Sequence, residues 1–289
     1  MMAALENKID FVMFFTVYGA NPNGDPLNEN MPRTDYDGYG EISDVCIKRK
    51  IRNRMQDKGH SIFVQANDRI DDAVKSLEER FGAEFKQPKI DPDDKVYQVS
   101  CEKWIDVRSF GQVMTFQSRS IGIRGPVSIT LAKSLSPVDV MSMQITRSTN
   151  GMKAKEGATR SSDTMGTKHF VEFGVYKVKG SINAYFAEKT GFTAADAEIV
   201  KDALCSLFVN DSSAARPEGS MEVKQLYWFK HPSKLGVASS AKVHELVETE
   251  VKDKNIRPAK YEDYSISLNK QKLAVLEEKG LQVEVLEGL

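Results

Sequence analysis

The feature that most constrains the fold is the run IDFVMFFTVY at residues 9–18. Aromatic and branched residues at nearly every position favour a β-strand, and their apolar character requires that the strand be buried. The run is too short to cross a membrane, because a spanning helix needs about 20 apolar residues. Turn-forming residues follow it at positions 19–26, GANPNGDP. The sequence therefore predicts a sheet whose core contains this strand.

Composition places the chain among ordinary globular proteins of one or two domains, with 289 residues, 40% hydrophobic and 28% charged. Glu6 and Asp10 near the start argue against a signal peptide. The three cysteines, Cys46, Cys101 and Cys205, are widely separated. They predict neither a local zinc site nor a disulfide framework, so we expect a reducing, cytoplasmic setting, no metal and no cofactor.

The net charge of −1 argues against a nucleic-acid-binding protein, but the charge is unevenly distributed. Residues 111–170 contain eight Lys or Arg against three acids, whereas residues 60–95 contain nine acids against six bases. A neutral chain with a basic middle is compatible with binding a polyanion on one face. Many enzymes share this pattern, so the charge alone does not decide the function.

A basic helix is predicted after the first loop, with Ser43 as its N-cap and its end near Lys58. Ile47, Ile51 and Met55 share one face and form the predicted core stripe. Six basic residues lie between positions 48 and 58, and only Asp44 and Asp57 accompany them. A helix built only for solubility mixes both signs, so this deficit of acids favours a binding face.

The remaining pattern predicts an α+β domain with insertions. Residues 60–104 resemble an insertion with a short helix at 74–81, and SRSIGIRGPVSIT from Ser118 is a glycine-bearing loop that leads into a strand. Strands are expected at 138–146, 170–179, 223–230 and 281–286, and helices at 193–208, with Thr193 and Asp196 as a capping box, and near 240–252. The order of the core elements is βαββαβ, which predicts a ferredoxin-like sheet.

The segment RSTNGMKAKEGATRSSDTMGTK at residues 147–168 is small, polar and basic, with almost no core-forming residues. This composition is typical of a mobile surface loop, or of a loop that orders against a partner. No catalytic motif was found in the chain, and its four histidines are scattered. Asp25, Asp35 and Asp37 lie in the loop after the first strand, where turn chemistry accounts for them. We therefore expect a binding protein and not an enzyme.

Four segments together resemble a known family, the Cas-seven (Csd-two) backbone subunit of the type I-C CRISPR Cascade. The resemblance runs in order from residue 9 to residue 229, and its segments are ANPNGDPLNENMPRTD, ISDVCIKRKIRNRM, SIGIRGPVSIT and KHFVEFGVYKVKGSINA. It implies a single hand-shaped domain over residues 1–289. Its palm would be of the RNA-recognition-motif type, with a fingers insertion at 60–110 and a β-hairpin thumb at 147–169.

The same resemblance implies the function and the partners. Copies would stack head to tail along a CRISPR guide RNA as a filament, next to other Cascade subunits (Cas-five, a Cas-eight type and a small subunit). Target DNA would then be read by base pairing with the guide. The residues implied to contact RNA are Asn21, Asn23, Arg33, Lys48, Arg49, Arg52, Arg119, Arg124, Lys153, Lys155, Arg160 and Lys168, with Met152 or Met165 as an apolar wedge between bases.

Two alternatives stay open at this point. A type III-like subunit would cut RNA with Asp25 or Asp35 from the loop after the first strand. A generic single-stranded RNA-binding protein would bind RNA without forming regular filaments. The sheet strands lack an evident pair of stacking aromatics, which argues against free sequence-specific binding.

Overall fold

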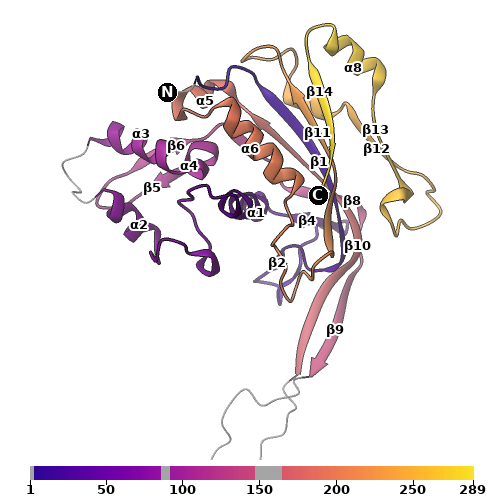
Figure 1. Ribbon diagram of the computed structural model, residues 1–289. Helices are drawn as coiled ribbons and strands as arrows, with labels where there is room; N and C mark the ends of the chain where they lie inside the picture. The colour runs from indigo at the N-terminus through magenta and orange to yellow at the C-terminus, as the bar shows by residue number, and fades with distance from the viewer. Residues whose placement is uncertain (1–2, 86–91, 147–164) are drawn as a thin grey trace, which may run out of the picture.

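The computed structural model describes residues 3–85, 92–146 and 165–289 (Figure 1). The strands are β1 Ile9–Ala20, β2 Gly24–Asp25, β3 Met31–Pro32, β4 Tyr39–Ile42, β5 Gly111–Met114, β6 Ile121–Arg124, β7 Val127–Ile129, β8 Ala132–Pro137, β9 Val140–Thr146, β10 Met165–Ile182, β11 Met221–Lys230, β12 Val247–Val251, β13 Tyr264–Leu268 and β14 Gln282–Glu287. The helices are α1 Asp44–Asp57, α2 Leu77–Glu84, α3 Asp93–Lys103, α4 Ile105–Phe110, α5 Ala184–Thr190, α6 Ala194–Cys205, α7 Ser240–His244 and α8 Lys270–Glu277, with two short 3-10 turns at Asn67–Arg69 and Tyr261–Asp263.

The fold is a mixed α and β structure around one central antiparallel sheet. Its strand order is β14-β11-β1-β10-β8-β4, and β7 and β9 also pair with β10. The predicted buried strand is confirmed as β1, which pairs with β10 on one side and β11 on the other. Both of its edges are therefore occupied, which satisfies its backbone polar groups inside the core.

Strand β1 is buried on both faces. Phe11, Met13 and Phe15 point into the core beneath α1 and α6, while Val12 and Phe14 point into a second core on the opposite face. The second core is closed by β12, β13 and α8, which lie on the far side of the sheet from α1 and α6 (Figure 1). Successive strand residues point to opposite faces, so a strand buried twice needs apolar residues at nearly every position.

Helices α1 and α6 begin as the sequence predicts. The Ser43 side chain accepts a hydrogen bond from the Cys46 amide at 3.3 Å and caps α1. Thr193 and Asp196 form the expected reciprocal capping box of α6. The stripe of Ile47, Ile51 and Met55 is fully buried. The two helices therefore lie side by side and cover one face of the sheet.

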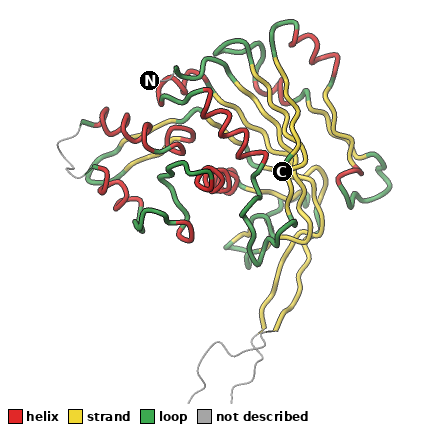
Figure 2. The backbone as a smooth tube through the Cα atoms, in the orientation of Figure 1, coloured by secondary structure: helices red, strands yellow, loops and turns green. Residues whose placement is uncertain are grey.

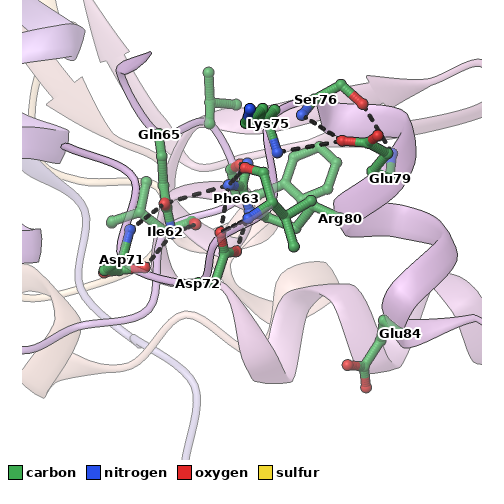
Figure 3. A network of polar contacts seen from close by, with 12 residues as sticks. Ile62, Phe63, Gln65, Asp71, Asp72, Lys75, Ser76, Glu79, Arg80 and Glu84 are labelled. Carbon is green, nitrogen blue, oxygen red and sulfur yellow. Dashed lines mark hydrogen bonds and ion pairs between the residues drawn. The ribbon is translucent and has the colours of Figure 1, made fainter. Parts of the chain in front are cut away.

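Between α1 and β7 the chain forms the inserted unit, which we define as residues 62–124. It has its own hydrophobic cluster, built from Phe63, Phe81, Phe85, Val96, Cys101, Trp104, Val107, Met114, Ile121 and Ile123. Arg80 ties the loop before α2 together (Figure 3), since its guanidinium donates to the carbonyls of Phe63 and Val74 and binds Asp72. The hairpin of β5 and β6 packs on this core, so the unit extends past residue 110.

Two expected elements differ from the observed ones. The helix expected near residues 240–252 is wrong beyond His244, because Val247–Val251 is strand β12 and pairs with β13. Its sequence, VETEV, alternates with the period of a strand. The helix expected at 74–81 is α2 at Leu77–Glu84, which begins at a capping box of Ser76 and Glu79. In the described ranges, none of the helices combines the length and apolarity needed to cross a membrane.

Candidate nucleic-acid interface

Helix α1 and its C-cap residue Lys58 carry six basic residues, and carboxylates pair with five of them, three from distant parts of the chain. Lys48 pairs with Asp44 at 3.0 Å within the helix, and Arg54 with Asp57 at 2.8 Å. The other pairs are distant in sequence: Arg52 with Asp106 at 3.0 Å, and Lys50 with Asp211 and Lys58 with Asp202 in close contact. The deficit of acids within the helix is thus largely compensated by the fold.

Arg49 is the exception on this helix. Among the described residues it makes no ion pair, and its Nη1 atom is buried without a hydrogen-bond partner. Burial lowers the pKa of Arg49, and the nearby positive charge of Arg52 lowers it further. A guanidinium stays protonated in proteins, so Arg49 is a partly buried cation with an unsatisfied donor. An added anion would satisfy it.

The loop after β1 is fixed by its own turns. Asn23 Oδ1 accepts from the amide and the hydroxyl of Ser43 at 2.9 and 3.0 Å, so this side chain positions the start of α1. Asn21 is buried and donates to the Asn30 carbonyl at 2.7 Å. Arg33 pairs with Asp25 at 3.2 Å. Asn21 and Asn23 therefore bind the protein itself in this structure.

The loop carboxylates have turn roles. Asp25 accepts from the Leu27 amide at 3.2 Å, and Asp35 accepts from the amides of Asp37 and Tyr39 at 3.0 and 2.8 Å. The hydrogen bond from Lys133 is the largest cause that lowers the pKa of Asp35. In the described part of the chain, no three His, Cys, Asp or Glu side chains cluster as metal ligands.

Arg119 and Arg124 lie in the inserted unit, away from α1. Arg119 pairs with Asp93 at 2.8 Å, and Arg124 stacks over the Phe186 ring at 4.1 Å. Gly125 allows the chain to approach itself closely, because a Cβ there would lie 2.3 Å from the Ser109 carbonyl oxygen. Packing of Gly125 against residues 109–111 of the inserted unit therefore explains this glycine.

A projecting hairpin extends from the sheet, formed by β9 and residues 165–171 of β10 (Figure 2). Met143 lies opposite Lys168, and Met165 opposite Thr146, so Lys168 and Met165 lie on different faces of the hairpin. Neither strand of this stem contains a carboxylate. The predicted residues Met152, Lys153, Lys155 and Arg160 lie outside the described residues.

Sequence reasoning missed an apolar face on this hairpin. The side chains of Met141, Met143 and Ile145 are 46%, 53% and 47% exposed, and all three lie on the same face as Lys168. The alternation in VMSMQIT was the signal that predicts it, because alternate residues of a strand share a face. An exposed apolar face of this kind is typical of a surface that meets a partner.

The fold defines a class of protein in which an antiparallel sheet is covered on both faces. The chain adds to this sheet an inserted unit and a projecting hairpin whose two strands contain no carboxylate. The chain belongs to the family of the CRISPR-associated protein Cas7, whose family model matches residues 7–269. A CRISPR-associated protein Cas7 of Haloferax volcanii is 25% identical over 234 residues, which cover 75% of this chain and 68% of that protein.

Solved structures of CRISPR RNA-guided surveillance complexes also contain similar chains. One, from a complex in a pre-nicking state, has a TM-score of 0.48 at 16% identity and is matched over 77% of this chain and 75% of its own. Another has a TM-score of 0.43 at 15% identity and is matched over 77% of this chain and 68% of its own.

Proposed function

We propose that this chain is a non-catalytic backbone subunit of a type I-C Cascade, many copies of which coat one CRISPR guide RNA. Membership of the Cas7 family supports the assignment, together with the sequence segments that resemble the type I-C subunit. The other Cascade subunits bind along the same filament, and the filament presents the guide for pairing with target DNA.

The main observation in favour of an RNA contact is the buried, unsatisfied donor of Arg49. Four other cations of α1 and Lys58 at its C-cap form ion pairs with carboxylates. Arg49 has a buried donor and no ion pair among the described residues, and the carboxylates of Asp106 and Asp68 act on it only from a longer distance. A phosphate oxygen of the guide fits this position, since it supplies both the negative charge and the missing acceptor. A phosphate contact at this one cation is also compatible with a net charge of −1, because each copy neutralises only a few phosphates.

The order of the strands supports a ferredoxin-like palm. In sequence the core elements are β1, α1, β7 with β8, β10, α6 and β11, which is the βαββαβ order. In this palm β12, β13 and α8 cover the part of the sheet around Val12 and Phe14, on the face where RNA-recognition motifs stack bases. The guide therefore runs on the α1 side and reaches the projecting hairpin, which serves as the thumb. The inserted unit serves as the fingers.

The test is to co-express the chain with its CRISPR array and partner subunits, weigh the purified complex by native mass spectrometry and sequence its RNA. We expect near-integer numbers of copies on one intact repeat-derived RNA. Arg49→Glu should release the RNA, while Lys254→Glu should retain it, because Lys254 is exposed and pairs only loosely with Glu250 at 3.8 Å.

Other outcomes identify the alternatives. An RNA-free monomer from the wild-type chain would contradict the backbone role and favour a generic RNA-binding protein. Cleavage of target RNA that stops in Asp25→Ala or Asp35→Ala would make the chain a nuclease.

A further inference from the structure

The root of the projecting hairpin is where two strands leave the covered sheet. Val140 lies opposite Val171 there, and the Glu172 amide donates to the Asp139 carbonyl at 3.0 Å. Val171 is fully buried, whereas most side chains beyond it are exposed. An isolated two-stranded hairpin is marginally stable in water, so its direction depends on what holds the root.

The C-terminal unit, which we define as residues 237–281, lies against this root. Its Tyr264 is buried in a hydrophobic cluster against which Leu135 of β8 and Phe173 of β10 pack. These two residues flank the hairpin on the side of the sheet. Burial raises the pKa of Tyr264, and the side chain of Ser136 opposes this rise.

Two cations add polar contacts to the apolar ones. Lys177 Nζ, on β10, donates to the Val247 carbonyl of β12 at 3.1 Å. Arg257, in the loop between β12 and β13, forms an ion pair with Asp139, which lies in the turn between β8 and β9. The C-terminal unit thus contacts β8, β10 and the turn that starts the hairpin. The directions of β8 and β10 set the direction of the hairpin.

We propose that the C-terminal unit is a brace that fixes the direction of the projecting hairpin, with Arg257 and Tyr264 as its positioning residues. The inference deepens the proposed function, because the hairpin is the element assigned there to the nucleic acid. It gives a role to the C-terminal region, which closes the sheet face and aims the hairpin at the same time. Regular contact with a guide requires every copy to hold its hairpin in the same direction.

The experiment measures that direction as a distance between two spin labels, in the full-length chain without RNA. One label is placed at Thr146→Cys on β9 and the other at Lys230→Cys on β11, both at exposed positions. Burial raises the pKa of the native thiols Cys46 and Cys205, and that of Cys101 to about 12. The native cysteines therefore react slowly, and labelling favours the two introduced positions.

We expect a narrow distance distribution in the parent chain. Arg257→Asp should broaden it by about twofold, because two acids then face each other at the root. Adding Asp139→Arg should narrow it again, since the pair is restored with its charges exchanged. Tyr264→Phe, which keeps the ring and removes the hydroxyl, should broaden it less. Lys254→Asp is the matched control on the same loop and should leave it unchanged.

An unchanged distribution in both Arg257→Asp and Tyr264→Phe would overturn the brace. Equal broadening in Lys254→Asp would also overturn it, because the effect would then be one of net charge. The native mass of the assembled complex tests the proposed function separately. A wild-type chain that carries no RNA would refute that function, while the distance distributions would still decide whether the brace exists.

Discussion

Arg108 of the inserted unit binds Asp196 of α6 through two contacts, Nη2 to Oδ1 at 2.8 Å and Nε to Oδ2 at 3.1 Å. The same carboxylate accepts from the amide and the hydroxyl of Thr193 at 2.8 and 2.9 Å. One buried acid thus starts α6 and attaches the inserted unit to the helix layer. Such a carboxylate is costly to remove, because its loss leaves a partly buried guanidinium unpaired.

Asp196→Ala should therefore lower the free energy of unfolding by about 3 kcal/mol, as measured by urea denaturation. Thr193→Ala removes only the cap and should cost about 1 kcal/mol. Arg108→Met/Asp196→Ala should recover part of the loss, since no charge is then left unpaired. Equal losses for Asp196→Ala and Thr193→Ala would show that the ion pair contributes nothing.

Gly40 and Tyr176 form a second testable pair. A Cβ at Gly40 would lie 2.1 Å from the Tyr176 hydroxyl oxygen, and that ring is held by stacking on Phe15 at 5.5 Å. Gly40→Ala should destabilise the fold by about 2 kcal/mol through overpacking. The buried hydroxyl has no hydrogen-bond partner in the described part of the chain, so Tyr176→Phe alone should be near neutral. Combined with Gly40→Ala it should restore most of the stability, which a double-mutant cycle measures.

Lys177 predicts a pH dependence. Burial lowers its pKa from the ordinary 10.5 to about 8, and Lys179 contributes to the decrease. Between pH 8 and pH 10.5 the unfolded chain binds more protons at this group than the folded chain does, so its contribution to stability rises with pH there. Below pH 8 the folded protein bears the whole free-energy cost of holding protonated Lys177 at a partly buried position. After allowance for partial solvent exposure, it is about 1–2 kcal/mol.

The check is the difference in the free energy of unfolding between the wild type and Lys177→Met across this pH range. We expect the free energy of unfolding of the wild type to increase relative to that of Lys177→Met as the pH rises. Lys230→Met, at an exposed position of β11, is the control and should show a smaller trend. A flat difference for Lys177→Met would contradict the depressed pKa.

Arg49 predicts the salt dependence of RNA binding. Each phosphate contact contributes about 0.7 to the slope of log affinity against log salt for a single strand. Arg49→Ala should therefore reduce the magnitude of the slope by about that amount, in titrations of the purified chain with a labelled guide RNA. Lys254→Ala should leave the slope unchanged. Equal slopes for Arg49→Ala and Lys254→Ala would show that Arg49 does not contact a phosphate.

The local elements of the fold could be predicted because their signals are local. The cap at Ser43, the box of Thr193 and Asp196 and the buried strand β1 each depend on residues that are close in sequence. The strand β12 was missed because the residues before it form a helix and the alternation in VETEV is short, so its pairing with β13 was needed to distinguish strand from helix.

The site was harder to predict because its charges are paired across the fold. The sequence suggested a helix face with too few acids, but Asp106, Asp202 and Asp211 are distant in the chain and lie next to α1 in space. The contribution of a basic residue to binding depends on what charge is left after such pairing. Among the described residues Arg49 forms no ion pair, and this distinguishes it from Lys48 and Arg52. No sequence pattern distinguishes the three residues.

Strand β1, buried on both faces, also has a consequence for synthesis. It leaves the ribosome more than 200 residues before the segments beyond position 240 that cover Val12 and Phe14. One side of the strand therefore remains apolar and uncovered until those segments have been made. Exposed strands of this kind aggregate readily. A chain that stops after β11 should need a chaperone to stay dispersed, although its other core could be complete.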